Sequence, residues 1–143
     1  MVFFLGLASS FILLIIALFH FYWAFGGTYG VDKVIPTKDN KTKALHPPTF
    51  ITLLVALVLL LMGITYLQGA KVYELTFLPQ FLKKYGLMFF SIIFIVRAIG
   101  DFKYVGFFKK IKDTIFGIND TRYYAPLCLF LGISGIVILV LGN

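Results

Sequence analysis

Charged residues are scarce in this chain. They make up 13% of its 143 residues, against about 25% in an ordinary soluble domain. Hydrophobic residues make up 60%, more than a soluble domain of this length could hide from water. These proportions exclude a water-soluble globular protein. The formal net charge of +7 does not indicate nucleic-acid binding, because the lysines lie in short segments that flank apolar runs, where they contact anionic lipids and fix orientation.

Motifs for known chemistry are also missing. The single cysteine, Cys128, lies in the last apolar run, which excludes an intramolecular disulfide and any CxxC redox or zinc pattern. The chain has no P-loop, no dinucleotide-binding glycine fingerprint and no serine nucleophile elbow. No enzyme class is therefore indicated, and we lean toward a protein without catalytic activity.

What the chain does have is four long apolar runs. A hydrocarbon core about 30 Å thick needs about 20 helical residues per crossing. The runs are continuous rather than alternating, which favours helices over a barrel. We predict an all-α polytopic integral membrane protein, a single domain over residues 1–143 folded as a four-transmembrane-helix bundle. The expected helices cover about residues 2–25, 49–67, 79–100 and 123–141.

The segment between the last two helices has its own pattern. From residue 102 to residue 118, aromatic and aliphatic side chains recur at helical spacing with lysines opposite them. A basic face over an aromatic face is typical of an amphipathic helix lying in the membrane interface. We therefore expect an interfacial helix here, with lipid contacts through Lys103, Lys109, Lys110 and Lys112.

Lysine and arginine counts predict the orientation. Segments 26–48 and 101–122 share one side of a four-span protein and hold nine of these residues, whereas Lys71, Lys83 and Lys84 lie on the other side. Basic loops stay in the cytoplasm. We expect a multi-pass plasma-membrane protein with both termini outside and the two long segments cytoplasmic.

Polar and aromatic residues gather at the cytoplasmic ends of the four helices. One interpretation is interfacial anchoring, because Trp and Tyr collect at membrane surfaces and Arg reaches out to water. The other is a ligand-binding pocket, in which Arg97 pairs with Asp101 four residues later. Arg97 and Arg122 would then receive negative charge, while Trp23 and Tyr124 pack on the apolar part of the ligand. The candidate residues are His20, Trp23, Arg97, Asp101, Arg122 and Tyr124.

Three chemistries are open to this cluster. Bis-histidine haem ligation would use His20 and His46, the only histidines. Zinc would take the same two and Asp101, although no HExxH-type spacing exists. Acid–base work on a lipid-like substrate could use His20 or Asp101. We expect no metal and no cofactor.

The function most favoured by the sequence is binding or handling of a small amphiphilic or lipid-like molecule at a cytoplasm-facing pocket between the helices. One alternative is a subunit of a homo-oligomeric transporter of small molecules or ions, its path lined by Ser9, Ser10 and Thr52. Another is a non-catalytic accessory protein that uses the basic interfacial segment.

Three short motifs resemble those of a known family. They are His20-Phe21-Tyr22-Trp23-Ala24-Phe25-Gly26-Gly27, Arg97-Ala98-Ile99-Gly100-Asp101-Phe102 and Arg122-Tyr123-Tyr124-Ala125-Pro126-Leu127, with Pro47 before the second helix. The chain resembles a group of small bacterial four-helix membrane proteins known only as a domain of unknown function. The resemblance implies a bacterial plasma membrane and carries no activity, substrate or cofactor.

Overall fold

The computed structural model describes residues 1–39, 47–74 and 76–142, and within these ranges the chain forms helices and no β-strand. The all-α class is therefore confirmed. The elements are α1 (Val2–Ala24), α2 (Val31–Val34), α3 (Thr49–Gly69), α4 (Gln80–Ile99), α5 (Ile115–Asn119), the π-helical turn η1 (Asp120–Tyr124) and α6 (Ala125–Leu141).

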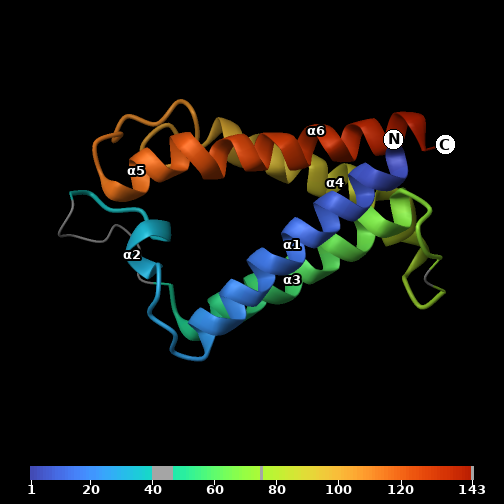
Figure 1. Cartoon of the computed structure of the whole chain (residues 1–143), viewed down its shortest axis with the longest axis horizontal. Helices are drawn as coiled ribbons and strands as arrows, with labels where there is room; N and C mark the ends of the chain where they lie inside the picture. The colour runs from blue at the N-terminus through green and yellow to red at the C-terminus, as the bar shows by residue number, and fades with distance from the viewer. Residues whose placement is uncertain (40–46, 75, 143) are drawn as a thin grey trace.

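The long helices form two pairs. α1 packs along α3, and α4 packs along α6. The pairs meet at the end of the molecule that carries both termini and diverge toward the opposite end, where α2 and α5 lie (Figure 1). We call that second end the loop end, because it holds the described residues 25–39, 47–48 and 100–114.

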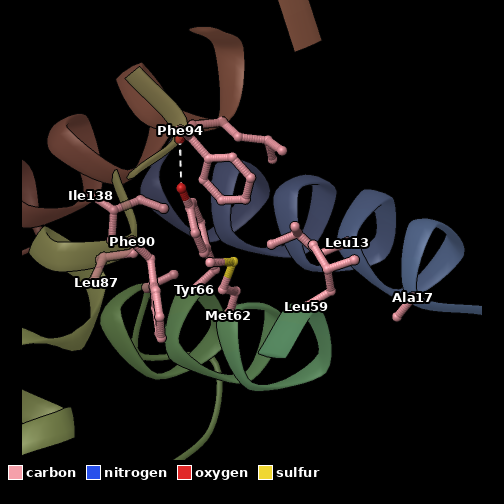
Figure 2. Packing of buried hydrophobic residues seen from close by; sticks show 11 residues of the cluster. Leu13, Ala17, Leu59, Met62, Tyr66, Leu87, Phe90, Phe94 and Ile138 are labelled. Carbon is pink, nitrogen blue, oxygen red and sulfur yellow. Dashed lines mark hydrogen bonds between the residues drawn. The ribbon is translucent and has the colours of Figure 1, made fainter. Parts of the chain in front are cut away.

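The core lies where the two pairs meet. Tyr66 of α3 is fully buried, and its hydroxyl donates a hydrogen bond of 2.6 Å to the carbonyl of Leu131 in α6 (Figure 2). Glycine allows α6 to lie close to α4: a Cβ at Gly132 would come within 3.1 Å of the Ser91 carbonyl oxygen. Close backbone approach at small residues is how helices pack without a hydrophobic driving force between them.

Three stretches of helix are long and apolar enough to cross a membrane: Val2–Ala24, Thr49–Gly69 and the continuous run Ile115–Leu141. Their outer faces carry large exposed apolar side chains, including Phe4, Phe11 and Phe50. Such faces suit contact with lipid rather than water.

The last of these runs contains a π-helical turn, for which Pro126 gives a reason. Proline has no N–H to donate to the carbonyl four residues before it, and its ring crowds that carbonyl. The turn widens instead, so that the Ala125 N–H donates to the Asp120 carbonyl five residues back. The widened turn extends from Asp120 to Tyr124.

The expected interfacial helix over residues 102–118 is wrong. Residues 100–114 form a folded loop, and only α5, from Ile115, is helical. Gly100, Phe102 and Gly106 have φ angles of 95°, 62° and 86°, which no right-handed helix accommodates. The loop instead returns to the end of α4, where the Phe107 N–H donates to the Ala98 carbonyl at 2.8 Å. This bond satisfies a helix-end carbonyl that has no partner within its own helix.

Candidate functional site

Asp120 is the centre of a buried ionic network at the loop end. Its side chain is completely buried. One carboxylate oxygen accepts a hydrogen bond from Arg97 Nη2 at 2.8 Å, and the other accepts from Lys109 Nζ at 3.1 Å and from the Gly106 N–H at 2.7 Å. The predicted pair of Arg97 with Asp101 is therefore wrong, because Arg97 pairs with Asp120 of η1.

Lys109 is buried as deeply as Asp120. Besides Asp120, its ammonium group donates to the Gly106 carbonyl at 2.9 Å and to Thr121 Oγ1 at 2.6 Å. An ammonium group has three donors, so these partners use all of them. The expected lipid contact through Lys109 is therefore wrong, whereas Lys103, Lys110 and Lys112 are exposed.

Asp101 organises the beginning of the same loop. Its Oδ1 accepts hydrogen bonds from the backbone N–H groups of Lys103, Tyr104 and Val105 at 2.9, 2.7 and 2.9 Å. Desolvation raises the pKa of this carboxyl, but the N–H groups of Val105, Lys103 and Tyr104 together outweigh it and hold the pKa below its ordinary value. Asp101 thus shapes the loop and does not orient Arg97.

The role of this ionic network is to stabilise the fold. Buried charges are tolerated only when their partners are all present, and here those partners come from α4, from the loop and from η1. The network joins the three segments at one point. It also engages Nη2 of the guanidinium that was expected to receive an anionic ligand, whereas Nη1 of Arg97 is buried without a hydrogen-bond partner.

The remaining predicted site residues lie apart from this network. His20 Nδ1 donates to the Ile16 carbonyl at 2.8 Å within α1, and the His20 ring lies 5.1 Å from that of Trp23. Arg122 stacks over the Tyr123 ring at 5.4 Å. The Tyr124 hydroxyl donates to the Lys33 carbonyl at 3.2 Å.

A broad, open pocket of about 450 Å³, which we call the cavity, lies at the loop end between α2 and the ends of α1 and α3. Its polar lining is Trp23, Thr28, Asp32 and Thr52. Its remaining lining is Gly27, Val31, Ile35 and Pro47.

Local hydrogen bonds build the wall of this cavity from the first motif. The Gly27 N–H donates to the Tyr22 carbonyl at 2.9 Å and turns the chain at the end of α1. Trp23 Nε1 then donates to the Tyr29 carbonyl at 2.9 Å, which fixes the indole against the segment leading to α2. The edge of the indole is thereby engaged, and the rings of Phe19 and His20 lie 5.8 and 5.1 Å from it. The part of the half-buried indole that lines the cavity remains for a ligand.

Of the six predicted site residues, only Trp23 lines the cavity. Asp32 and Thr28 were not predicted as site residues, and Thr52 was considered only for the path of a transporter. The sequence signal that could have indicated the cavity is the glycine-rich stretch after the first helix, where the chain turns back over the helix end. Asp120 was missed because nothing in its local sequence distinguishes it from an ordinary hydrated acid before the last helix.

The described part of the chain contains no group of three or more His, Cys, Asp or Glu side chains that could hold a metal ion. His46, the second haem or zinc ligand considered, lies outside the described residues. Haem or zinc ligation through His20 and His46 therefore stays a prediction.

Removing the charge of Asp120 should destabilise the protein strongly. The Asp120→Asn protein keeps Arg97 and Lys109 at the site without a counter-charge, which costs about 3–5 kcal/mol. Lys109→Met should cost at least about 2 kcal/mol, because it removes three hydrogen bonds of a charged group. Lys110→Met, at the exposed neighbouring position, should stay within about 0.5 kcal/mol of the wild type. Thermal unfolding in mild detergent measures all three, and equal effects at positions 109 and 110 would refute the buried network.

Asp101 should make stability depend on acid pH. Because its pKa is lower in the folded protein, it contributes stability above the unfolded carboxyl value of about 3.9 and loses that contribution as pH falls through the folded value. The wild-type melting temperature should therefore drop more steeply below pH 4 than that of Asp101→Asn. Asp113→Asn, an exposed acid in the same loop, should follow the wild type. Parallel profiles for the wild type and Asp101→Asn would contradict the assignment.

The comparisons with known proteins bear on the whole of this arrangement. A family model described as "Protein of unknown function (DUF3995)" matches residues 13–135. The match extends from α1 into α6 and includes the three motifs. No curated protein and no solved structure matches the chain significantly. The chain belongs to the DUF3995 family of proteins of unknown function.

Proposed function

We propose that this chain is a four-span membrane protein that binds a small amphiphilic or lipid-like molecule at the loop end, in the cavity between α1, α2 and α3. The observation that carries the proposal is the cavity itself. Its lining joins an indole, two hydroxyls and a carboxylate to aliphatic side chains. Binding sites for small molecules are concave and mostly apolar, with a few polar groups that fix orientation.

The position of the cavity supports an amphiphile rather than a fully water-soluble ligand. It lies where α1 ends and α3 begins, and both helices are apolar and long enough to cross a membrane. Phe25 and Phe50, at these two helix ends, are 81% and 71% exposed. A ligand with its head in the cavity would have apolar surface beside it for its chain.

The fourth crossing is α4. Its 20 residues extend about 30 Å, which is the thickness of the hydrocarbon core. α4 packs along α6, so it lies at the same depth if α6 crosses. Its charged residues are Lys83 and Lys84 in the first turns and Arg97 in the last. At those positions the lysine side chains can extend to the membrane surface, and Arg97 can pair with Asp120.

A bacterial plasma membrane, with the loop end in the cytoplasm, is the location that we propose. The asymmetry of lysine and arginine between the two sides supports this orientation. It does not depend on Lys109, since Lys33, Lys38, Lys103, Lys110 and Lys112 are all exposed in loop-end segments. Both termini lie at the opposite end (Figure 1).

Transport through a homo-oligomer has less support. Of the three residues expected along a path, Thr52 lines the cavity, while Ser9 is fully buried in the bundle. The Ser10 hydroxyl faces the close contact of α1 with Gly63. These positions favour a bounded site over a continuous path.

Cysteine labelling tests the number of crossings. In a Cys128→Ala background, single cysteines at Lys38, Glu74 and Lys110 are probed in intact cells with a membrane-impermeant maleimide. Four crossings place Lys38 and Lys110 on the same side, so only the cysteine at position 74 should react before permeabilisation. If α4 does not cross, position 110 will behave like position 74.

Fluorescence of Trp23 tests ligand binding directly, because it is the only tryptophan in the chain. The protein in nonionic micelles is titrated with decyl amphiphiles that carry bromine on the alkyl chain and a maltoside, a trimethylammonium or a sulfate head. At least one should quench Trp23 saturably at one molecule per protein. A larger side chain in the cavity, Val31→Phe, should reduce this affinity about tenfold, because the ligand loses about 1.4 kcal/mol of contact.

Val34→Phe supplies the matched control, since Val34 lies in α2 but does not line the cavity. It should bind as the wild type does. Quenching that rises linearly with every probe, and that is the same in both variants, would mean simple partitioning into the micelle and would end the proposal.

A further inference from the structure

We infer that the ligand of the α1–α2–α3 cavity carries a positively charged head group, of the primary-amine or quaternary-ammonium class. This inference rests on the proposed function and names the chemistry that the same site would recognise. It reverses the charge expected from the sequence, where arginines were to receive an anion.

The first ground is the charge of the lining. Among the described residues that line the cavity, only Asp32 has an acidic or basic side chain. A carboxylate accepts hydrogen bonds from an amine and attracts any cation. Lys33, the next residue, is not part of the lining, and its carbonyl is turned to the Tyr124 hydroxyl.

The second ground is that neither arginine of the chain lines the cavity. Arg97 is bound to the buried Asp120 at 2.8 Å, and Arg122 lies over the ring of Tyr123. An anionic head group placed in the cavity would meet the Asp32 carboxylate, and no cation of the described lining would compensate it.

The third ground is Trp23. Its indole N–H already donates to the Tyr29 carbonyl, so it can offer a ligand the ring surface that Phe19 and His20 leave open toward the cavity. Among aromatic side chains, indole makes the strongest cation–π contacts. Proteins commonly hold quaternary ammonium groups against aromatic rings, and a nearby carboxylate adds charge attraction. Thr28 and Thr52 add hydroxyls that can accept hydrogen bonds from an amine.

The aliphatic part of the lining fits the rest of such a molecule. Val31 and Ile35 come from α2 and the residue that ends it, and Pro47 precedes α3. These side chains have no polar group to satisfy. An alkylamine or alkyl ammonium compound therefore finds both of its parts matched, the cation by Asp32 and Trp23 and the chain by the aliphatic wall.

The three brominated decyl amphiphiles, which differ only in their head groups, test the inference. The trimethylammonium probe should bind about tenfold more tightly than the maltoside probe, as expected for one partly exposed ion pair together with one cation–π contact. The sulfate probe should bind more weakly than the maltoside probe. Quenching of Trp23 supplies the dissociation constants.

Substitutions of Asp32 separate charge from packing. Asp32→Asn should reduce the tenfold preference to about threefold or less, because only the cation–π contact with Trp23 then favours the cation. The affinity for the maltoside probe should stay within about twofold, and Asp32→Glu should retain the preference. Asp113→Asn, which removes an exposed acid from the loop after α4, should change nothing. A tenfold preference that is unchanged in Asp32→Asn would overturn the inference.

The failures of the two proposals are distinguishable. Saturable binding of all three probes with equal affinity, or tighter binding of sulfate, would refute the cationic head group and leave the binding function standing. The absence of saturable quenching by any probe would refute the binding function itself. Circular dichroism of each variant checks that its helices have formed.

Discussion

The carboxylate of Asp120, enclosed with two cations, constrains the whole loop end of the molecule. An isolated buried charge is too costly to persist, so the chain must bring Arg97, Lys109 and the Gly106 N–H to it at the same time. Those groups come from a helix and from a loop that would otherwise be free to move in water. The requirement that all of them be present converts residues 100–114 from a flexible connection into a defined structure.

The close turns of that loop follow from the same requirement. Gly106 can place its N–H on Asp120 only if the chain passes tightly by Gly100, where a side chain on either residue would meet backbone atoms. Asp101 then holds the turn between them through three backbone N–H groups. The motif Arg97-Ala98-Ile99-Gly100-Asp101-Phe102 is therefore explained by folding, and so is Pro126 of the third motif, which accounts for the widened turn that begins at Asp120.

Sequence reasoning succeeded where a pattern extends over many residues and failed where a few contacts decide. The spans at α1, α3 and α6 could be predicted because some twenty apolar residues in a row leave few other structures. The amphipathic pattern of residues 102–118 misled because aromatic and lysine residues also alternate in a compact loop. Two glycines six residues apart were the contrary signal. Lys109 and Lys110 are chemically identical in sequence, and only the position of Asp120 makes one buried and the other exposed.

The first motif, from His20 to Gly27, is not explained by folding in this way, and two of its residues line the proposed binding site. Trp23 and Gly27 build a cavity wall, and no buried charge or helix crossing requires that wall. Its far side is α2, whose Lys33 carbonyl accepts a hydrogen bond from Tyr124. Tyr124 ends the π-helical turn that begins with Asp120. The turn that carries Asp120 therefore also positions Tyr124, which contacts α2. Through this contact the two diverging helix pairs are joined at the loop end by the wall of the proposed binding site.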